Sequence, residues 1–146
     1  MFQMRKVLCP TDFSPCSDAA VDHAVALAKT FKAEVVLLHV VPNFDFYLAT
    51  PDMVTLPVLL DSSRKHASEE LAKASRRIEG VAVRTELLQG TVHECILAAA
   101  ASAKADLIVL GTHGRTGVKH MLLGSVAERV VRLSPVPVLT VRTHGK

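Results

Sequence analysis

The sequence contains no tryptophan and few aromatic residues of any kind. Phe, Trp and Tyr together make up 4% of the 146 residues, although 49% of the chain is hydrophobic. The core must therefore be built from Val, Leu, Ile and Ala, as is typical of a buried parallel sheet packed against helices. The net charge is only +3, and no aromatic residues are interleaved with the basic ones, so we expect no nucleic-acid partner.

Long apolar runs, a leader and a cysteine ligand pattern are also missing. The longest apolar runs, at residues 35–41 and 95–101, are too short to cross a bilayer, and the first residues lead directly into a strand. We therefore expect no membrane partner and a cytoplasmic location. Cys9, Cys16 and Cys95 have no metal-ligand spacing, which indicates reduced thiols and no metal held by protein ligands.

Strand-like and helix-like segments alternate along the chain. Apolar segments predict strands at residues 6–9, 35–41, 81–88, 106–110 and 136–141. Apolar residues at helical spacing predict helices at residues 15–31, 60–78, 92–104 and 126–133. This βα order predicts one doubly wound α/β domain that spans residues 1–146. Its five-stranded sheet is expected to be mainly parallel, with right-handed crossovers and helices on both faces.

Local signals mark where these elements begin and which way they face. Ser14 followed by Pro15 predicts a helix N-cap and the first helical position, and Thr91 with Glu94 predicts a capping box. The expected buried stripes are Ala20, Ala24, Leu27, Ala28 and Phe31 in the first helix, and Val126, Val130 and Leu133 in the last. Alternating polarity in the third strand and Pro137 in the fifth predict that both are edge strands.

The most informative local feature is a glycine-rich segment after the fourth predicted strand. Gly111-Thr112-His113-Gly114 follows that strand directly, and Gly124-Ser125 opens the next predicted helix. Glycine lets a ligand approach the backbone closely, and a helix N-terminus offers unpaired N–H groups and a partial positive charge to an anion. The segment therefore indicates a phosphate site, and glycines that merely turn the chain are the alternative.

A second polar cluster, Pro10-Thr11-Asp12, follows the first predicted strand. Asp12 could accept hydrogen bonds from ribose hydroxyls or hold a hydrated cation, and capping of the next helix by Asp12 or Ser14 is the local alternative. The first and fourth strands of doubly wound sheets are commonly neighbours, and ligands bind where the strand order reverses. We therefore expect Asp12 to lie beside Gly111 at the switch point.

These residues resemble the universal stress proteins, specifically their ATP-binding branch. The signature Gly-x2-Gly-x9-Gly-Ser/Thr is met by Gly111, Gly114, Gly124 and Ser125. The segments at residues 10–14, 38–40 and 134–139 also look like that family, so the resemblance spans essentially the whole chain. It implies a Rossmann-like fold similar to that of the adenine nucleotide alpha hydrolases. One departure is Ala127, where the family often carries a hydroxyl.

The resemblance also implies a role for each part of an ATP site. Asp12 would contact the ribose, Val40 would give backbone contacts to the adenine edge, and Leu110 would line the base. Pro10 would also line the base, Gly111 and Gly114 would admit the ribose and phosphates, and Gly124, Ser125 and Val126 would hold phosphate oxygens through their N–H groups and the Ser125 hydroxyl. Thr11, His113 and Arg115, which adjoin these residues, complete the candidate site. A Mg²⁺ or Mn²⁺ ion would be held mainly through the phosphates and water.

Dedicated catalytic groups are not evident. The Walker pattern Gly-x4-Gly-Lys-Ser/Thr does not occur, and no base for water is apparent. His113, Arg115 and Lys119 are the loop residues that could contact phosphate, and His113 could equally be a solvent-facing residue. His39, inside an apolar strand, is expected to be a satisfied core residue and not a ligand.

Three functions are compatible with these residues. The first is an ATP-binding regulatory protein with slow or no hydrolysis, the second an ATPase or phosphotransferase with an unknown acceptor, and the third a structural stress dimer without nucleotide. The intact glycine and serine positions favour the first. An apolar edge strand at residues 136–141 tends to be paired or covered, and the resemblance implies a homodimer through that strand.

Overall fold

The computed structural model describes residues 1–43, 56–113 and 123–143, which form a layered α/β structure. The strands are β1 (Lys6–Pro10), β2 (Glu34–Pro42), β3 (Val83–Gly90), β4 (Leu107–Gly111) and β5 (Val138–Val141). The helices are α1 (Pro15–Phe31), α2 (Leu56–Arg76), α3 (Val92–Ala103) and α4 (Ser125–Leu133). No helix in this described part of the chain is long and apolar enough to cross a membrane.

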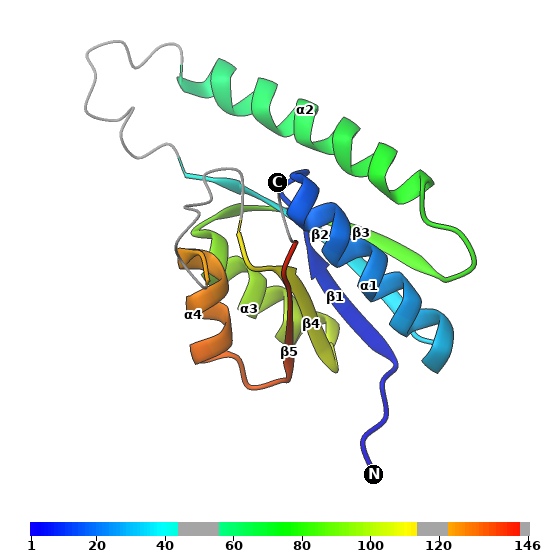
Figure 1. Cartoon of the computed structure of the whole chain (residues 1–146). Coiled ribbons are helices and arrows are strands. Elements are labelled where there is room, and N and C mark those ends of the chain that lie inside the picture. Colours follow the sequence, from blue (N-terminus) through cyan, green and yellow to red (C-terminus); the bar gives the residue numbers. More distant parts are fainter. Residues whose placement is uncertain (44–55, 114–122, 144–146) are drawn as a thin grey trace.

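The sheet has the order β3-β2-β1-β4-β5, and each neighbouring pair of strands is parallel (Figure 1). The chain moves outward from β1 to β2 and β3, then returns through α3 to place β4 on the other side of β1. The order therefore reverses between β1 and β4. The predicted doubly wound fold is confirmed, and so is the prediction that β3 and β5 are the two edges.

Two layers of helices bury the two faces of the sheet (Figure 1). Under α1 and α2 the core consists mainly of strand residues such as Val7, Val35 and Val109 packed on small helix residues such as Ala20 and Ala24. The opposite face packs on α3 and α4, and its strand residues are Leu8, Val36, Leu38, Val40, Ile108 and Leu110. Aliphatic and small residues fill both cores, as the shortage of aromatic residues predicts.

The helix starts agree with the sequence in one case and differ in another. Ser14 is the N-cap of α1, its hydroxyl accepts a hydrogen bond from Ser17 N–H at 3.2 Å, and Pro15 begins the helix as predicted. Thr91 is the N-cap of α3 by its backbone, but its side chain makes no capping hydrogen bond, so the expected capping box is wrong. Thr91 and Glu94 are exposed, and water can satisfy the donors at that helix end.

Two residues expected in buried helical stripes are exposed. Phe31 is 52% exposed and Leu133 is 50% exposed, and each is the last residue of its helix. The chain leaves α1 through the left-handed residue Lys32, and Ala33, two residues after Phe31, is buried. In α4, Ala127 and Val130 cover the sheet, because so short a helix needs only one turn of apolar contact.

Candidate functional site

The candidate site lies at the carboxyl ends of β1 and β4, which are neighbours where the strand order reverses. The turn that follows β1 and the start of α4 both lie at this end of the sheet (Figure 1), and the Gly124 N–H at the start of α4 donates to the carbonyl of Thr112, directly after β4, at 2.6 Å. The structure thus brings together the two clusters that the sequence predicts. Gly114 and Arg115 lie outside the described residues.

Asp12 is held tightly by the start of α1. Its Oδ1 accepts hydrogen bonds from Ser17 Oγ at 2.6 Å and from Ser14 N–H at 3.0 Å. The Asp12 N–H in turn donates to Ser17 Oγ at 3.2 Å. The local capping role left open by the sequence is therefore present, and it fixes the carboxylate at the mouth of the switch point. Contact of Asp12 with a ribose remains a prediction.

Phe13 and His39 form a stacked pair beside Asp12. Their ring centroids are 4.5 Å apart with an interplanar angle of 29°, and His39 Nδ1 lies 2.7 Å from the Thr11 carbonyl oxygen. A carbonyl only accepts, so Nδ1 carries the donated hydrogen. Phe13 has a φ of 65°, in the left-handed region that bulky residues rarely adopt. His39 has a hydrogen-bond partner, as predicted, but it is partly exposed and not a core residue, and sequence reasoning missed that it anchors this turn.

The backbone of Val40 faces the switch point. Thr11 N–H donates to the Leu38 carbonyl at 2.8 Å on the β1 side of β2, whereas Val35 N–H donates to the Ala82 carbonyl at 2.9 Å on the β3 side. Backbone groups of alternate residues in a strand point in opposite directions, so the N–H and carbonyl of Val40 also face the β1 side. At Val40 the pairing of β2 with β1 has already ended.

Thr112 joins the end of β4 to its surroundings. Its N–H donates to the Val141 carbonyl at 2.9 Å, and its carbonyl accepts a hydrogen bond from Gly124 N–H at 2.6 Å. Thr112 thereby ties the end of β4 to β5 and to the beginning of α4. Thr112 is buried, and the sequence offered no signal for this role beyond its place between Gly111 and His113.

Gly111 and Gly124 allow close packing within the protein. A Cβ on Gly111 would lie 2.7 Å from Cys16 Sγ and 3.1 Å from the Cys16 carbonyl oxygen, so this glycine lets α1 rest on β4. A Cβ on Gly124 would lie 3.1 Å from the Thr112 carbonyl oxygen. Because the Gly124 N–H donates to that oxygen, the expectation that this N–H holds a phosphate does not fit the arrangement.

The start of α4 has backbone N–H groups without intrahelical partners, which is the feature that an anion site needs. Gly124 is its N-cap, and the first intrahelical bond runs from Glu128 N–H to the Gly124 carbonyl at 2.9 Å. The N–H groups of Ser125 and Val126 precede that bond and so belong to the donors that a helix cannot pair internally. They carry the partial positive charge of the helix N-terminus toward the loop after β4.

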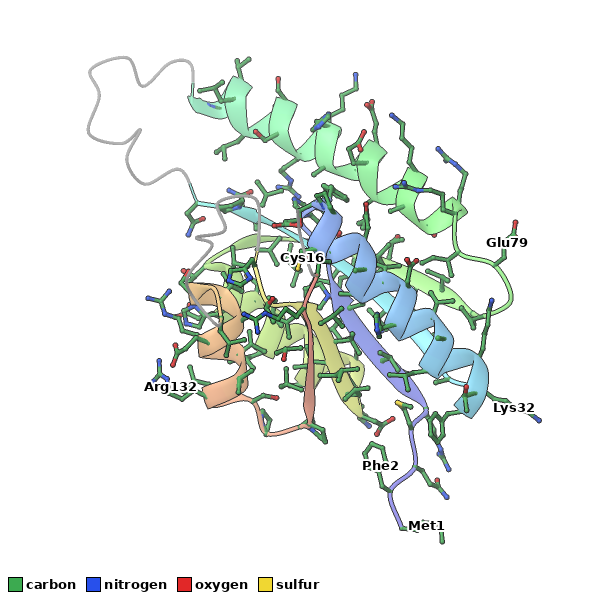
Figure 2. The ribbon with its side chains drawn as sticks, viewed as in Figure 1. Met1, Phe2, Cys16, Lys32, Glu79 and Arg132 are labelled. Carbon is green, nitrogen blue, oxygen red and sulfur yellow. The ribbon has the colours of Figure 1, made fainter. Side chains whose placement is uncertain are left out.

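The thiols near the site are buried and structural. Cys16 lies at the start of α1 and its Sγ is 3.6 Å from the Val141 carbonyl oxygen (Figure 2). Burial raises the pKa of the Cys9 thiol to about 12. Within residues 1–43, 56–113 and 123–143, no three His, Cys, Asp or Glu side chains are grouped so that they could hold a metal ion.

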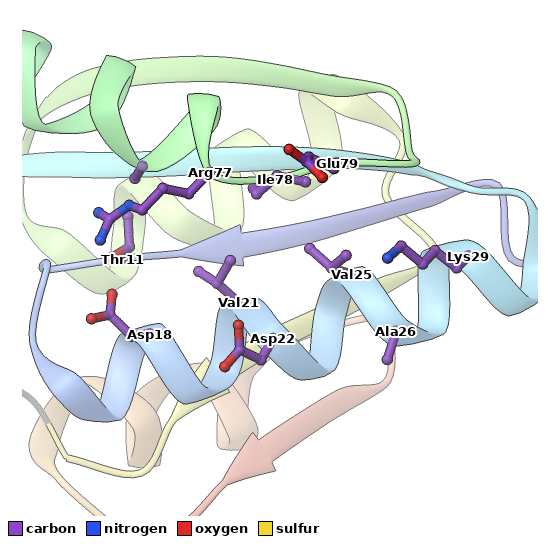
Figure 3. Close-up of a pocket in the computed structure, with 11 residues that line it drawn as sticks. Thr11, Asp18, Val21, Asp22, Val25, Ala26, Lys29, Arg77, Ile78 and Glu79 are labelled. Carbon is purple, nitrogen blue, oxygen red and sulfur yellow. The ribbon is translucent and has the colours of Figure 1, made fainter.

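A separate groove of about 520 Å³ lies between α1 and the turn that follows α2. Thr11 is the single predicted site residue that lines it. Arg77 reaches toward Thr11 and Asp18 at one end, and Lys29 lies at the other (Figure 3). The groove is therefore distinct from the space between β4 and α4, and it provides an alternative location against which ligand binding can be mapped.

Comparisons with known proteins agree with the observed fold. The model of the universal stress protein family matches residues 4–142. Universal stress protein MJ0531 of Methanocaldococcus jannaschii is 39% identical over 144 residues, which cover 97% of this chain and 84% of that protein. The solved structure of MJ0577, from the same organism, has a TM-score of 0.85 and 31% identity and covers 99% of both chains. A universal stress protein solved in complex with cAMP has a TM-score of 0.71 and 26% identity, covering 94% of this chain and 97% of that one.

Proposed function

Because this chain belongs to the universal stress protein family, we propose that it binds ATP at the carboxyl ends of β1 and β4. In this proposal the protein is a nucleotide-dependent regulatory dimer with slow or no hydrolysis. The observation that carries it is the pairing of two features across the switch point. The backbone of Val40 faces it from one side, and the N-terminus of α4 faces it from the other.

The nucleobase belongs at the Val40 side of the site. An adenine edge offers an acceptor at N1 and a donor at N6, which complement one backbone N–H and one carbonyl. Val40 and Leu110 are both buried in the core under α3 and α4, and Pro10 ends β1 beside them, so the base would meet apolar surface. A related universal stress protein has been solved in complex with cAMP, which carries the same base, and this supports an adenine ligand.

The phosphates belong at the start of α4. The N–H groups of Ser125 and Val126 and the exposed Ser125 hydroxyl suit phosphate oxygens, and the helix dipole favours their charge. The proposal also includes His113, Gly114 and Arg115 as phosphate contacts. The Gly124 N–H is left out, because it holds the Thr112 carbonyl.

A divalent cation fits this site only as a companion of the nucleotide. Asp12 is the carboxylate at the switch point, and its Oδ1 already accepts two hydrogen bonds from the start of α1. Mg²⁺ or Mn²⁺ would therefore be held mainly by phosphate oxygens and water, and it would neutralise charge between the phosphates. The described residues near the switch point supply no positioned base for water, which favours binding over turnover.

The proposed homodimer forms through β5. This strand is an edge of the sheet, paired with β4 on one side, and its Leu139 is 37% exposed. An apolar edge strand is a template for pairing with another chain. We propose that β5 pairs with its copy in a second subunit, across a two-fold axis.

Thermal unfolding with ATP and Mg²⁺, beside GTP and AMP, tests the nucleotide site. Ligand at about 100 times its dissociation constant stabilises the folded state by about 2.7 kcal/mol. For a domain of this size that amounts to a rise of about 5–10 °C in Tm. We expect this rise with ATP and none with GTP. The absence of any rise with ATP would contradict the proposal.

A pair of serine variants locates the phosphates. Ser125→Ala removes a hydroxyl at the start of α4 and is expected to weaken ATP binding about 3- to 10-fold, as for the loss of one hydrogen bond. Ser102→Ala makes the same change at an exposed position of α3 and is expected to leave the affinity unchanged. Equal affinities for the two variants would place the phosphates elsewhere.

A further inference from the structure

The Thr11 carbonyl has an unexpected hydrogen-bond partner. In a parallel ladder, the bond from Thr11 N–H to the Leu38 carbonyl would be followed by one from Val40 N–H to the Thr11 carbonyl. The backbone hydrogen bonds of the described residues include the first of these and not the second. The Thr11 carbonyl instead accepts a hydrogen bond from His39 Nδ1 at 2.7 Å. The His39 side chain thus takes the place of the Val40 N–H as the donor to the Thr11 carbonyl.

The turn beyond Thr11 is strained and is held by the same histidine. Phe13 has a φ of 65°, and a non-glycine residue in such a conformation is strained and persists only when its surroundings impose it. Its N–H donates to Thr11 Oγ1 at 3.0 Å, and its ring stacks on the His39 imidazole at 4.5 Å. His39 therefore contacts both ends of this short turn.

We propose that His39 is a positioning residue that keeps the backbone edge of Val40 available to the nucleobase. By holding the Thr11 carbonyl, His39 prevents that oxygen from accepting the Val40 N–H and so prevents the β1–β2 ladder from closing over the site. By stacking on Phe13, it keeps the turn in its strained form. The inference rests on the proposed adenine site, and it adds the residue that sets the selectivity of that site for the base.

His39→Leu removes both contacts and places an apolar side chain at this position of β2. The Thr11 carbonyl then becomes available to the Val40 N–H. A hydrogen bond between them adds one backbone pair to β1 and β2, and the Val40 N–H can no longer donate to the base. His39→Asn is the matched control, because the asparagine Nδ2 lies where the histidine Nδ1 lies and can donate to the same carbonyl. The two variants therefore separate the hydrogen bond from the loss of the ring.

The readout is the preference for ATP over ITP, which share the ribose and triphosphate. Hypoxanthine carries a donor at N1 and an acceptor at position 6, the reverse of adenine, so an ordered backbone edge discriminates against it. We expect wild type and His39→Asn to prefer ATP, and His39→Leu to lose about 3- to 10-fold of that preference, as measured by isothermal titration calorimetry. Preference for ATP in His39→Leu equal to that of wild type would overturn the inference and leave the ATP site standing. No binding of ATP by wild type would instead contradict the proposed function.

Hydrogen exchange supplies a test that needs no nucleotide. In ligand-free His39→Leu, the Val40 amide is expected to exchange more slowly than in wild type, because it now donates to the Thr11 carbonyl. A merely structural role for His39 predicts faster exchange at Val40 and its neighbours. If the leucine variant does not fold, His39→Gln serves in its place, since its amide lies one bond too far out to donate to Thr11. Unchanged or faster exchange at Val40 in the folded variant would overturn the inference.

Discussion

The packing of α1 on β4 predicts that Gly111 tolerates no side chain. A Cβ at this position would lie 2.7 Å from Cys16 Sγ, 3.1 Å from the Cys16 carbonyl oxygen and 3.2 Å from the carbonyl carbon. The last two atoms belong to the backbone of α1, so a change of side-chain rotamer cannot make room. Gly111→Ala must therefore push the start of α1 away from the sheet.

Overpacking of this kind costs about 1–3 kcal/mol. In a domain of this size the melting temperature falls by about 2–4 °C for each kcal/mol, so we expect Gly111→Ala to melt about 2–12 °C below wild type. Urea denaturation gives the free energy directly. Cys16→Ala, added to Gly111→Ala, removes the 2.7 Å contact and leaves the two backbone contacts, so it should recover only part of the loss.

Gly124→Ala is the matched comparison. Its Cβ would meet the Thr112 carbonyl oxygen at 3.1 Å, its φ of −68° suits any residue, and no contact falls below 3.0 Å. We expect it to be less destabilising than Gly111→Ala. A wild-type melting temperature for Gly111→Ala would refute the packing account, as would complete recovery in the double variant.

Further predictions concern the core, the thiols and the dimer. Val130→Ala, at a position with no exposed surface, should cost about 1–3 kcal/mol in urea denaturation, whereas Val131→Ala, at a position 44% exposed, should cost less than about 0.5 kcal/mol. Burial raises the pKa of Cys9 from 9.0 to about 12, so the stability it contributes is complete below pH 9 and is lost as the pH rises toward 12. In urea denaturation the free energy of unfolding should fall with pH because of this thiol, by a slope that approaches about 1.4 kcal/mol per pH unit in that range. Cys9→Ala should lack this contribution to the slope. Val138→Lys, on the edge strand, should convert a dimer to a monomer in light scattering, and a monomeric wild type would contradict the proposed pairing through β5.

The fold follows from the sequence because its signals are regular and repeated. Apolar segments predicted every described strand, and Pro137 and the alternating third strand identified both edges. Single-residue details were less predictable. Phe31 has the right spacing for a buried stripe, but spacing does not tell where a helix passes the edge of its sheet. Thr91 has the right neighbours for a capping box, yet exposure to water removes the need for one.

The candidate site was predicted in its location and only partly in its construction. The strand order places the turn at Thr11 beside the loop at Gly111, as expected for a doubly wound sheet. The packing role of Gly111 depends on Cys16, which is distant in sequence, and the hydrogen bond from Gly124 to Thr112 joins two residues that are not neighbours in the sequence. The anchoring of Thr11 by His39 occurs beside a positive φ at Phe13, which no sequence pattern indicates for a bulky residue.

The most direct test of the central claim is an NMR titration of the labelled protein with ATP and Mg²⁺, followed through the backbone amides. We expect the largest chemical-shift changes at the amides of the residues that surround the switch point: Val40, Gly111, Ser125 and Val126. Shifts confined to the groove at Asp18, Arg77 and Glu79 would place the nucleotide between α1 and the end of α2, and would contradict the proposed site.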